Sequence, residues 1–544
     1  MRKLVQLIFL AILFSACMKG QKVDLIIHNA RVHTMDENMS IEEAVAIRDG
    51  KIIEVGPERQ ILNKYRCEES IDALGKDVYP GLTDAHGHIF SYANQKMSVD
   101  LTGSKSYEEV LYRCEKFYSL TGKKFIIGRG WDQTLFSNKE MPDYRALSEK
   151  FPNIPVCLYR IDGHAALVNK RLLKMSGITA QTKVEGGEIQ LINAEPSGIL
   201  LDNAMNLINK HLPENSKEEW QEKIIEVQQE LLQYGITGVH EAGIEFDQIQ
   251  ILKELIDKNE LKVNIYAMLL PSAKNKEFAQ KNGPFSYRNL SIKSFKIYAD
   301  GALGSRGALL KKTYLDKPNS HGLLLTPISE MKNLSMFCLK NGYQMNIHGI
   351  GDSANAIILD ICKQVFNIKK DHRFRIEHAQ IIDPLDFQKF ADYAVFPSVQ
   401  PTHAVSDCRW VEQRIGKSRL KGAYAYKSLI NQYGMIAIGT DFPVEQINPF
   451  LTIHAAVERL NEKNEPLKGF LKEEAITIEE VMKGMTIWAA FSEFKENTRG
   501  SIEKGKEATI VIFDKPIVAN KTFIQNFAWK TFINGKVVYE LGEL

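Results

Sequence analysis

Two histidines lie close together at the end of an apolar run near the start of the chain. In the run Pro80 to His88, PGLTDAHGH, the residues His86 and His88 are two positions apart. Residues i and i+2 of a strand face the same side, so both imidazoles are expected to point one way. Gly87 would leave room for a metal between them. Such a pair alone is more often structural than metal-binding, because short motifs recur by chance.

Three later apolar runs end in the same kinds of side chain. His348 closes the run NIH, His378 closes IEH, and Asp441 closes IGTD. Independent structural histidines would not favour the carboxyl ends of strands, whereas a site built from several strand ends of one barrel requires this placement. The pattern therefore predicts that these residues converge with His86 and His88 on one site.

Such a convergence needs a scaffold of parallel strands. Short β-branched runs alternate with amphipathic helical stretches, as in repeated βαβ units. Eight candidate strands lie around residues 78–86, 236–241, 263–270, 292–300, 343–349, 374–379, 394–399 and 435–441. Eight is the number of strands in a closed (β/α)8 barrel. We therefore predict an α/β protein whose main domain, residues 79–494, is a TIM barrel.

The two ends of the chain are predicted to form one split β-sandwich, from residues 22–78 and 495–544. Both segments contain β-branched runs with hairpin signals, at Asp49-Gly50 and at Asn534-Gly535. Within the barrel, the interval 92–212 is too long for a loop and is expected to be an inserted subdomain. Because it follows the first barrel strand, it should cap the face where barrel active sites lie.

The sequence resembles the amidohydrolase superfamily, and within it the amidohydrolase-3 or YtcJ-like family, which includes N-substituted formamide deformylases. The resemblance covers nearly the whole mature chain. It implies one or two divalent metals, zinc before iron, manganese or cobalt. The implied ligands are His86, His88, His348, His378 and Asp441. A metal-activated hydroxide would attack the substrate carbonyl, with Asp441 as the proton carrier.

Lys296 lies in the run SFKIYADG, which resembles the family's K-x-x-x-D-G segment. Its implied role is to be carboxylated by CO2, giving an anionic carbamate that bridges two metals. The alternative is an ion pair with Asp300. Four residues of strand span roughly 13 Å, so a direct pair would require a sharp turn of the chain.

Further site residues are expected in the cap and at the barrel mouth. His164, in DGHAALVN, matches a family segment and is expected to hold or polarise the substrate. A satisfied turn histidine is the alternative. Trp131, in GRGWD, would supply an aromatic wall unless it belongs to the core. His403, after the seventh strand, and Arg306, after the fourth, are the other expected substrate contacts.

The N-terminus resembles a bacterial lipoprotein signal. Arg2 and Lys3 precede an apolar run that ends at Ser15-Ala16-Cys17. The run is too short for a stable membrane span. We expect residues 1–17 to direct export and Cys17 to carry the lipid anchor, which places the protein in the cell envelope. Secretion with cleavage nearby is the alternative.

The composition argues for a small-molecule enzyme. The formal net charge is +2 and no dense Lys/Arg block occurs, so a nucleic-acid partner is not expected. The six cysteines after Cys17 lack metal or disulfide spacing and are expected to be mostly buried. Self-association into a homo-oligomer is left open.

The predicted function is hydrolysis of a C–N bond in a carboxamide, formamide or cyclic amide. Two alternatives share the barrel. One is a metal-dependent isomerase or decarboxylase of the same superfamily. The other is a catalytically silent lipoprotein of the envelope that binds ligands. Such a protein has no need to keep a complete set of metal-ligating residues.

Overall fold

The computed structural model describes residues 20–517 and 523–542. The predicted signal segment, with Cys17, lies outside the described residues. Within them, no helix is both long and apolar enough to cross a membrane. The six described cysteines are unpaired, and all except Cys67 and Cys408 are buried.

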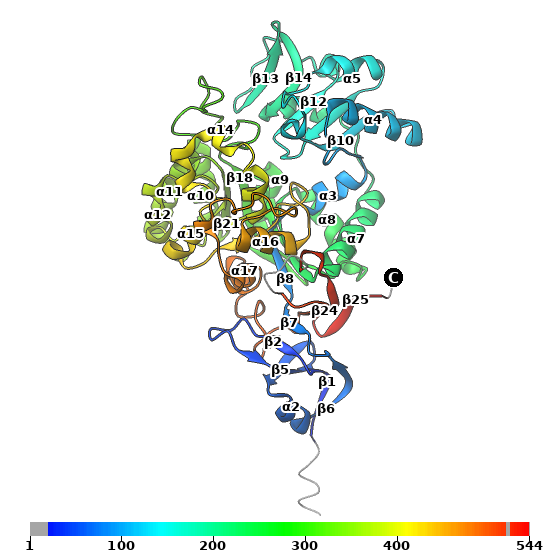
Figure 1. Ribbon diagram of the computed structural model, residues 1–544, viewed down its shortest axis with the longest axis vertical. Coiled ribbons are helices and arrows are strands. Elements are labelled where there is room, and N and C mark those ends of the chain that lie inside the picture. The colour runs from blue at the N-terminus through cyan, green and yellow to red at the C-terminus, as the bar shows by residue number, and fades with distance from the viewer. Residues whose placement is uncertain (1–19, 518–522, 543–544) are drawn as a thin grey trace, which may run out of the picture.

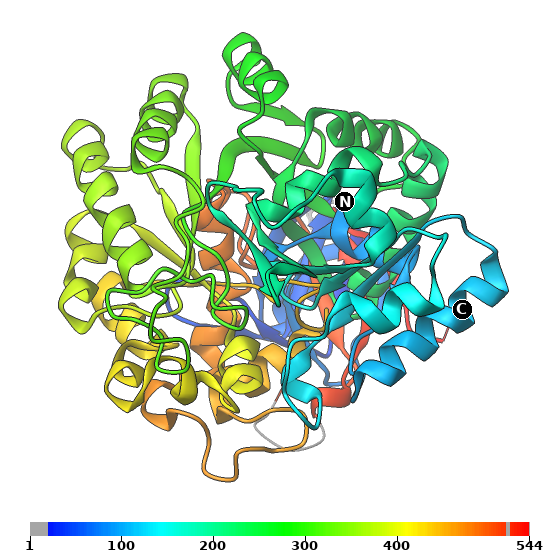
Figure 2. The ribbon, with the colours of Figure 1, turned by 90° about the horizontal axis from the view of Figure 1, so that it is seen from above.

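Eight parallel strands lie inside a ring of helices (Figure 2). In sheet order they are β8 (Leu82–Gly87), β15 (Ile236–Ile244), β16 (Asn264–Leu269), β18 (Leu290–Tyr298), β19 (Gln344–Gly349), β20 (Arg375–His378), β21 (Phe396–Val399) and β22 (Ala437–Ile438). The Asp441 N–H donates to the His86 carbonyl at 2.7 Å, which joins the last strand end to the first. The predicted TIM barrel is thereby confirmed.

Helices on the outside of the barrel connect these strands. They include α7 (Lys217–Gln233), α8 (Phe246–Asp257), α9 (Ala273–Asn282), α10 (Ile328–Asn341), α11 (Asp352–Ile368), α12 (Phe387–Asp392), α15 (Tyr426–Tyr433) and α16 (Pro449–Glu458). Helix α7 begins with a capping box between Ser216 and Glu219. Its apolar face, including Ile224, Val227 and Leu231, is buried in the main core.

The first predicted strand is two strands in the structure. β7 (Asp77–Pro80) pairs with β23 (Ile510–Phe513) of the C-terminal segment, whereas β8 pairs with β15 of the barrel. Gly81 separates them. A Cβ atom there would lie 2.3 Å from the Thr237 hydroxyl oxygen, so the chain can change sheets here only with glycine.

Segments from the two halves of the described chain form a pair of β-sheets in the lower half of Figure 1. One sheet contains β5 (Lys51–Gly56), β4 (Ala44–Arg48), β1 (Gln21–His28) and β6 (Tyr65–Asp72). The other contains β25 (Lys536–Glu540), β24 (Ala528–Ile533), β23, β7, β2 (Arg31–His33) and β3 (Ile41–Glu42). The dipeptides Asp49-Gly50 and Asn534-Gly535 form the turns of two antiparallel hairpins, with positive φ at all four residues.

The segment between β8 and α7 starts with α3 (Ile89–Lys96) and continues into a separate layer, at the top of Figure 1. Its sheet contains β13 (Gly187–Ile192), β14 (Glu195–Asp202), β12 (Ala165–Val168), β11 (Val156–Arg160), β10 (Ile126–Trp131) and β9 (Val99–Asp100). Helices α4 (Tyr107–Thr121), α5 (Tyr144–Lys150) and α6 (Lys170–Ser176) accompany it. Residues of this cap and of the barrel mouth line one shared cavity of about 1200 Å³.

Candidate metal centre

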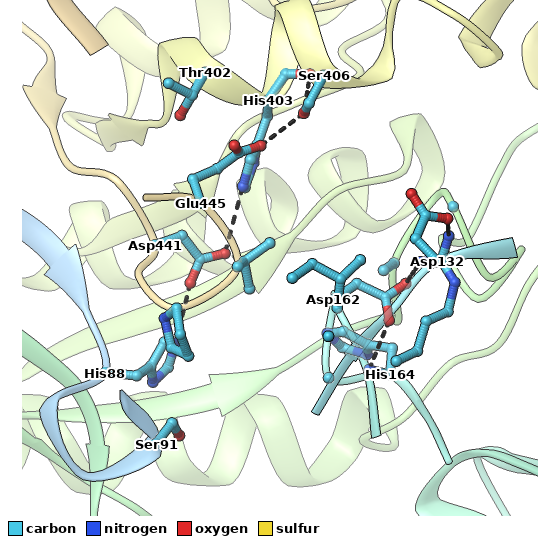
Figure 3. A pocket seen from close by; sticks show the side chains of 18 of the residues that line it. His88, Ser91, Asp132, Asp162, His164, Thr402, His403, Ser406, Asp441 and Glu445 are labelled. Carbon is cyan, nitrogen blue, oxygen red and sulfur yellow. Dashed lines mark hydrogen bonds and ion pairs between the residues drawn. The ribbon is translucent and has the colours of Figure 1, made fainter. Parts of the chain in front are cut away.

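Asp441 lies at the centre of the polar cluster beneath the cap (Figure 3). Its Oδ1 lies 3.2 Å from His88 Nε2 and 3.7 Å from His86 Nε2, and its Oδ2 lies 3.6 Å from His403 Nε2. Two sets of three side chains have donor atoms close enough to hold an ion. They are His86, His88 and Asp441, and His378, His403 and Asp441. One carboxylate is therefore shared by two potential ligand sets.

Hydrogen bonds from deeper in the barrel orient His86. Its Nδ1 lies 2.5 Å from Glu377 Oε2, and the other oxygen of Glu377 is 2.7 Å from Arg375 Nε. All three side chains are almost completely buried. A carboxylate on one ring nitrogen fixes the tautomer and leaves Nε2 as a metal donor. Sequence reasoning missed Glu377, although it directly precedes His378.

His348 and His378 lie side by side at the ends of β19 and β20, with ring centres 4.5 Å apart. His378 Nδ1 is 2.7 Å from Gln400 Oε1. His348 Nε2 lies 3.7 Å from Asp300 Oδ1. Asp300 itself accepts hydrogen bonds from the backbone N–H groups of 309, 350 and 351. It thus joins the loops after β18 and β19 beside His348.

The protonation states suit metal binding. Burial lowers the pKa of His86, His348 and His378 well below the usual value, so these imidazoles are neutral donors. Burial alone would raise the pKa of Asp441, but the surrounding histidines outweigh it and hold this pKa well below its usual range. Among the described residues, the buried Nε2 atoms of His348 and His403 have no hydrogen-bond partner. The donor set therefore fits a divalent metal.

Lys296 is buried in the same cluster, at 1% exposure. Its Nζ lies 3.5 Å from His86 Nε2 and 4.8 Å from the centre of the Tyr298 ring. Burial lowers the pKa of Lys296 to about 8. In the described part of the chain, no carboxylate lies within 4.0 Å of this amine, and Asp300 is occupied by backbone N–H groups. The alternative ion pair does not form.

His164 reaches the cavity from the cap. Its Nδ1 lies 2.6 Å from Asp202 Oδ1, and its ring centre is 5.1 Å from that of His348. Asp202 is buried at the end of β14, 38 residues further along the chain. This carboxylate, which sequence reasoning missed, orients the imidazole toward the metal centre.

The structure corrects the expectation that Trp131 contacts substrate. Its indole N–H donates to the Leu158 carbonyl at 2.7 Å, and the side chain lies in the apolar core of the cap. The pairing of β10 with β11 shifts register between Arg129 and Trp131, where Gly130 has φ +112°. This irregularity turns Trp131 away from the cavity, whereas Arg129 lines it.

Arg306 and Gly87 also differ from expectation. Arg306 does not line the cavity, since its position in a turn with φ +65° directs its guanidinium to Asp316, at 3.0 Å. Gly87 does not separate the two histidine rings. A Cβ atom there would lie 2.2 Å from the Phe442 ring, so glycine is needed for packing on the opposite side. His403, by contrast, lines the cavity beside Asp441.

A parallel barrel that gathers neutral imidazoles and one ionised carboxylate at the carboxyl ends of its strands has the donor set of a metal-dependent enzyme. Residues 69–539 match the model of the amidohydrolase family described as Amidohydro_3. The chain therefore belongs to the amidohydrolase family, as its motifs predict.

Individual relatives agree with this assignment. The chain is 29% identical to the putative amidohydrolase YtcJ of Bacillus subtilis, over 94% of this chain and 99% of that one. It is 26% identical to the N-substituted formamide deformylase of Arthrobacter pascens, over 96% and 99%. A crystal structure of an uncharacterised metal-dependent hydrolase from Pyrococcus horikoshii superposes with a TM-score of 0.74 at 27% identity, covering 91% and 98% of the chains. These likenesses support a hydrolase that uses a divalent metal.

Proposed function

We propose that this protein hydrolyses a C–N bond in a small amide, formamide or cyclic amide. The observation that carries the proposal is the Asp441 carboxylate, ionised and within 3.2–3.7 Å of His86, His88 and His403 beneath the cap. When bound, a divalent cation lowers the pKa of a coordinated water to about 7 and polarises the substrate carbonyl.

Residues of the chain transfer the proton and orient the substrate. Asp441 accepts the proton of the attacking water and transfers it to the leaving nitrogen, for which an ionised carboxylate at this position is suited. His164, held by Asp202, orients the substrate carbonyl from the cap side. The cap contributes part of the wall of this cavity, so its side chains are in reach of a bound substrate.

Zinc is the metal that we propose, since mixed imidazole and carboxylate ligation suits it. One or two ions would be held by His86, His88, His348, His378 and Asp441. We also propose that Lys296 is carboxylated. Its neutral amine attacks CO2, an N–C bond forms and one proton is released, which leaves an anionic carbamate facing His86.

The test is metal analysis of the purified protein together with a panel of N-formyl amines, N-acetyl amines and cyclic amides. We expect one or two divalent ions per chain and release of amine that stops on chelation and returns with zinc. Rearranged or decarboxylated product without hydrolysis would favour the isomerase or decarboxylase alternative. Bound ligand without any turnover would favour the binding protein.

We propose that Cys17 is lipidated and anchors the protein in the cell envelope. The order of a charged segment, an apolar run and small residues before Cys17 supports this. Replacement of Cys17 with serine should move the protein from the membrane to the soluble fraction, as measured by fractionation and immunoblotting. Equal partitioning of the two forms into the soluble fraction would contradict the lipid anchor.

A further inference from the structure

Arg129 is a cation of the cavity wall that lacks an acidic partner. It lies on β10 of the cap and lines the cavity beneath. Its only hydrogen bond within the described residues goes from Nη2 to the Ile161 carbonyl, at 3.2 Å. Its Nε is buried and has no partner. No carboxylate oxygen of the described chain lies within 4.0 Å of the guanidinium, and the acidic side chains whose negative charges act on it from further away are Asp441 and Asp162.

Both of these carboxylates have other partners: Asp441 lies 3.2 Å from His88 Nε2, and Asp162 is paired with Arg160 at 2.5 Å. Arg160 also pairs with Asp132 at 2.7 Å, and Arg409 at the cavity rim lies 3.5 Å from Asp132. Arg160 and Arg409 are therefore each paired with a carboxylate of the protein. Of these three arginines, only Arg129 has no carboxylate within 4.0 Å among the described residues.

The position of Arg129 is close to the reacting centre. A Cβ atom on Gly163 would lie 3.1 Å from its Nη2, so the guanidinium packs against the backbone next to His164. Arg129 also lines the same cavity as His88 and Asp441 of the metal centre. The guanidinium is thus near both the cap histidine and the metal centre.

A buried cation is costly unless an anion accompanies it. A guanidinium also presents parallel N–H donors that match the two oxygens of a carboxylate. We propose that Arg129 binds a carboxylate of the substrate, so that the enzyme acts on amides that carry an acid group, such as N-acyl amino acids. This inference rests on the proposed amide hydrolysis.

The experiment compares acids with their neutral counterparts. N-acetylglycine, N-acetyl-β-alanine and N-acetyl-γ-aminobutyrate place the carboxylate at increasing distances from the same amide, and each is paired with its carboxamide. For wild type, kcat/KM should favour the acid at one or more spacings. Arg129→Met should lower the acid-to-carboxamide ratio of kcat/KM about 10- to 100-fold, mainly through KM. Arg129→Lys keeps the positive charge but loses the pair of parallel N–H donors. Its acid-to-carboxamide ratio should lie between those of wild type and Arg129→Met.

Arg409→Met is the matched control, since this arginine lies on the same cavity but already has an acidic partner. Its acid-to-carboxamide ratio should stay at the wild-type value. If Arg129 only supported the loop through Ile161, Arg129→Met would lower acid and carboxamide turnover equally. An unchanged ratio, or a wild type without preference for any acid, would overturn the proposal.

Calorimetric titration separates this inference from the proposed hydrolysis. If no probe is hydrolysed, the hydrolytic function fails. The Arg129 assignment is still supported if wild type binds an N-acetyl acid more tightly than its carboxamide and Arg129→Met abolishes that difference. The Arg129 assignment would be contradicted if Arg409→Met also abolished the difference in affinity between the N-acetyl acid and its carboxamide. Metal content and thermal unfolding of each variant exclude a folding defect.

Discussion

The double variant His86→Ala/His88→Ala is expected to bind less metal than wild type and to lose its activity. Both residues lie within 3.7 Å of Asp441, and they form one of the two potential ligand sets with it. Metal content should fall by about one ion per chain, because the second set, His378, His403 and Asp441, is left intact. Lewis-acid stabilisation is worth several kcal/mol, so activity should fall on the order of 10³-fold or more.

Two further variants sharpen this prediction. Glu377→Gln keeps every ligand but removes the carboxylate from His86 Nδ1, and it should weaken metal affinity about 10- to 100-fold. His28→Ala removes a histidine of the β-sandwich that pairs with Glu58, and it should retain the metal. Mass-spectrometric metal analysis provides the measurement. Wild-type metal content in the double variant would show that the centre lies elsewhere.

The variant Lys296→Ala is expected to be almost inactive and to be partly rescued by added short-chain carboxylic acids. An unmodified ammonium next to divalent cations would be repelled by several kcal/mol at a low effective dielectric. A carbamate reverses the sign of that interaction. Small carboxylates would supply an anion at the vacated position of the alanine variant and so restore part of the activity.

Lys293→Ala is the control, because this lysine lies on the same strand, β18, outside the cavity. It should keep full activity and show no response to carboxylic acids. Mass spectrometry under a CO2 atmosphere and high-resolution density would detect the carbamate. A fully active Lys296→Ala enzyme, or an unmodified lysine pointing away from the metal, would leave a single-metal centre of His348, His378 and Asp441.

Short-range sequence patterns were enough to predict the barrel and most of the residues of the candidate metal centre. The strand runs and their alternation with helices predicted the barrel, because side-chain period and strand length are properties of short segments. The turns at Asp49-Gly50 and Asn534-Gly535 followed from the backbone conformations that these residues adopt. The placement of histidines at strand ends sufficed to gather them, since parallel strands end at one face.

Only the tertiary structure decided the partners of these residues. Glu377 meets His86 across 291 positions of sequence, and Asp202, at the end of β14, meets His164 beside the neighbouring strand β12. The irregularity at Gly130 accompanies a Trp131 packed into the core and an Arg129 turned to the cavity, for which the sequence had suggested no role. Such contacts depend on how separate elements pack in space, and a one-residue change in register moves a side chain to the other face of a sheet.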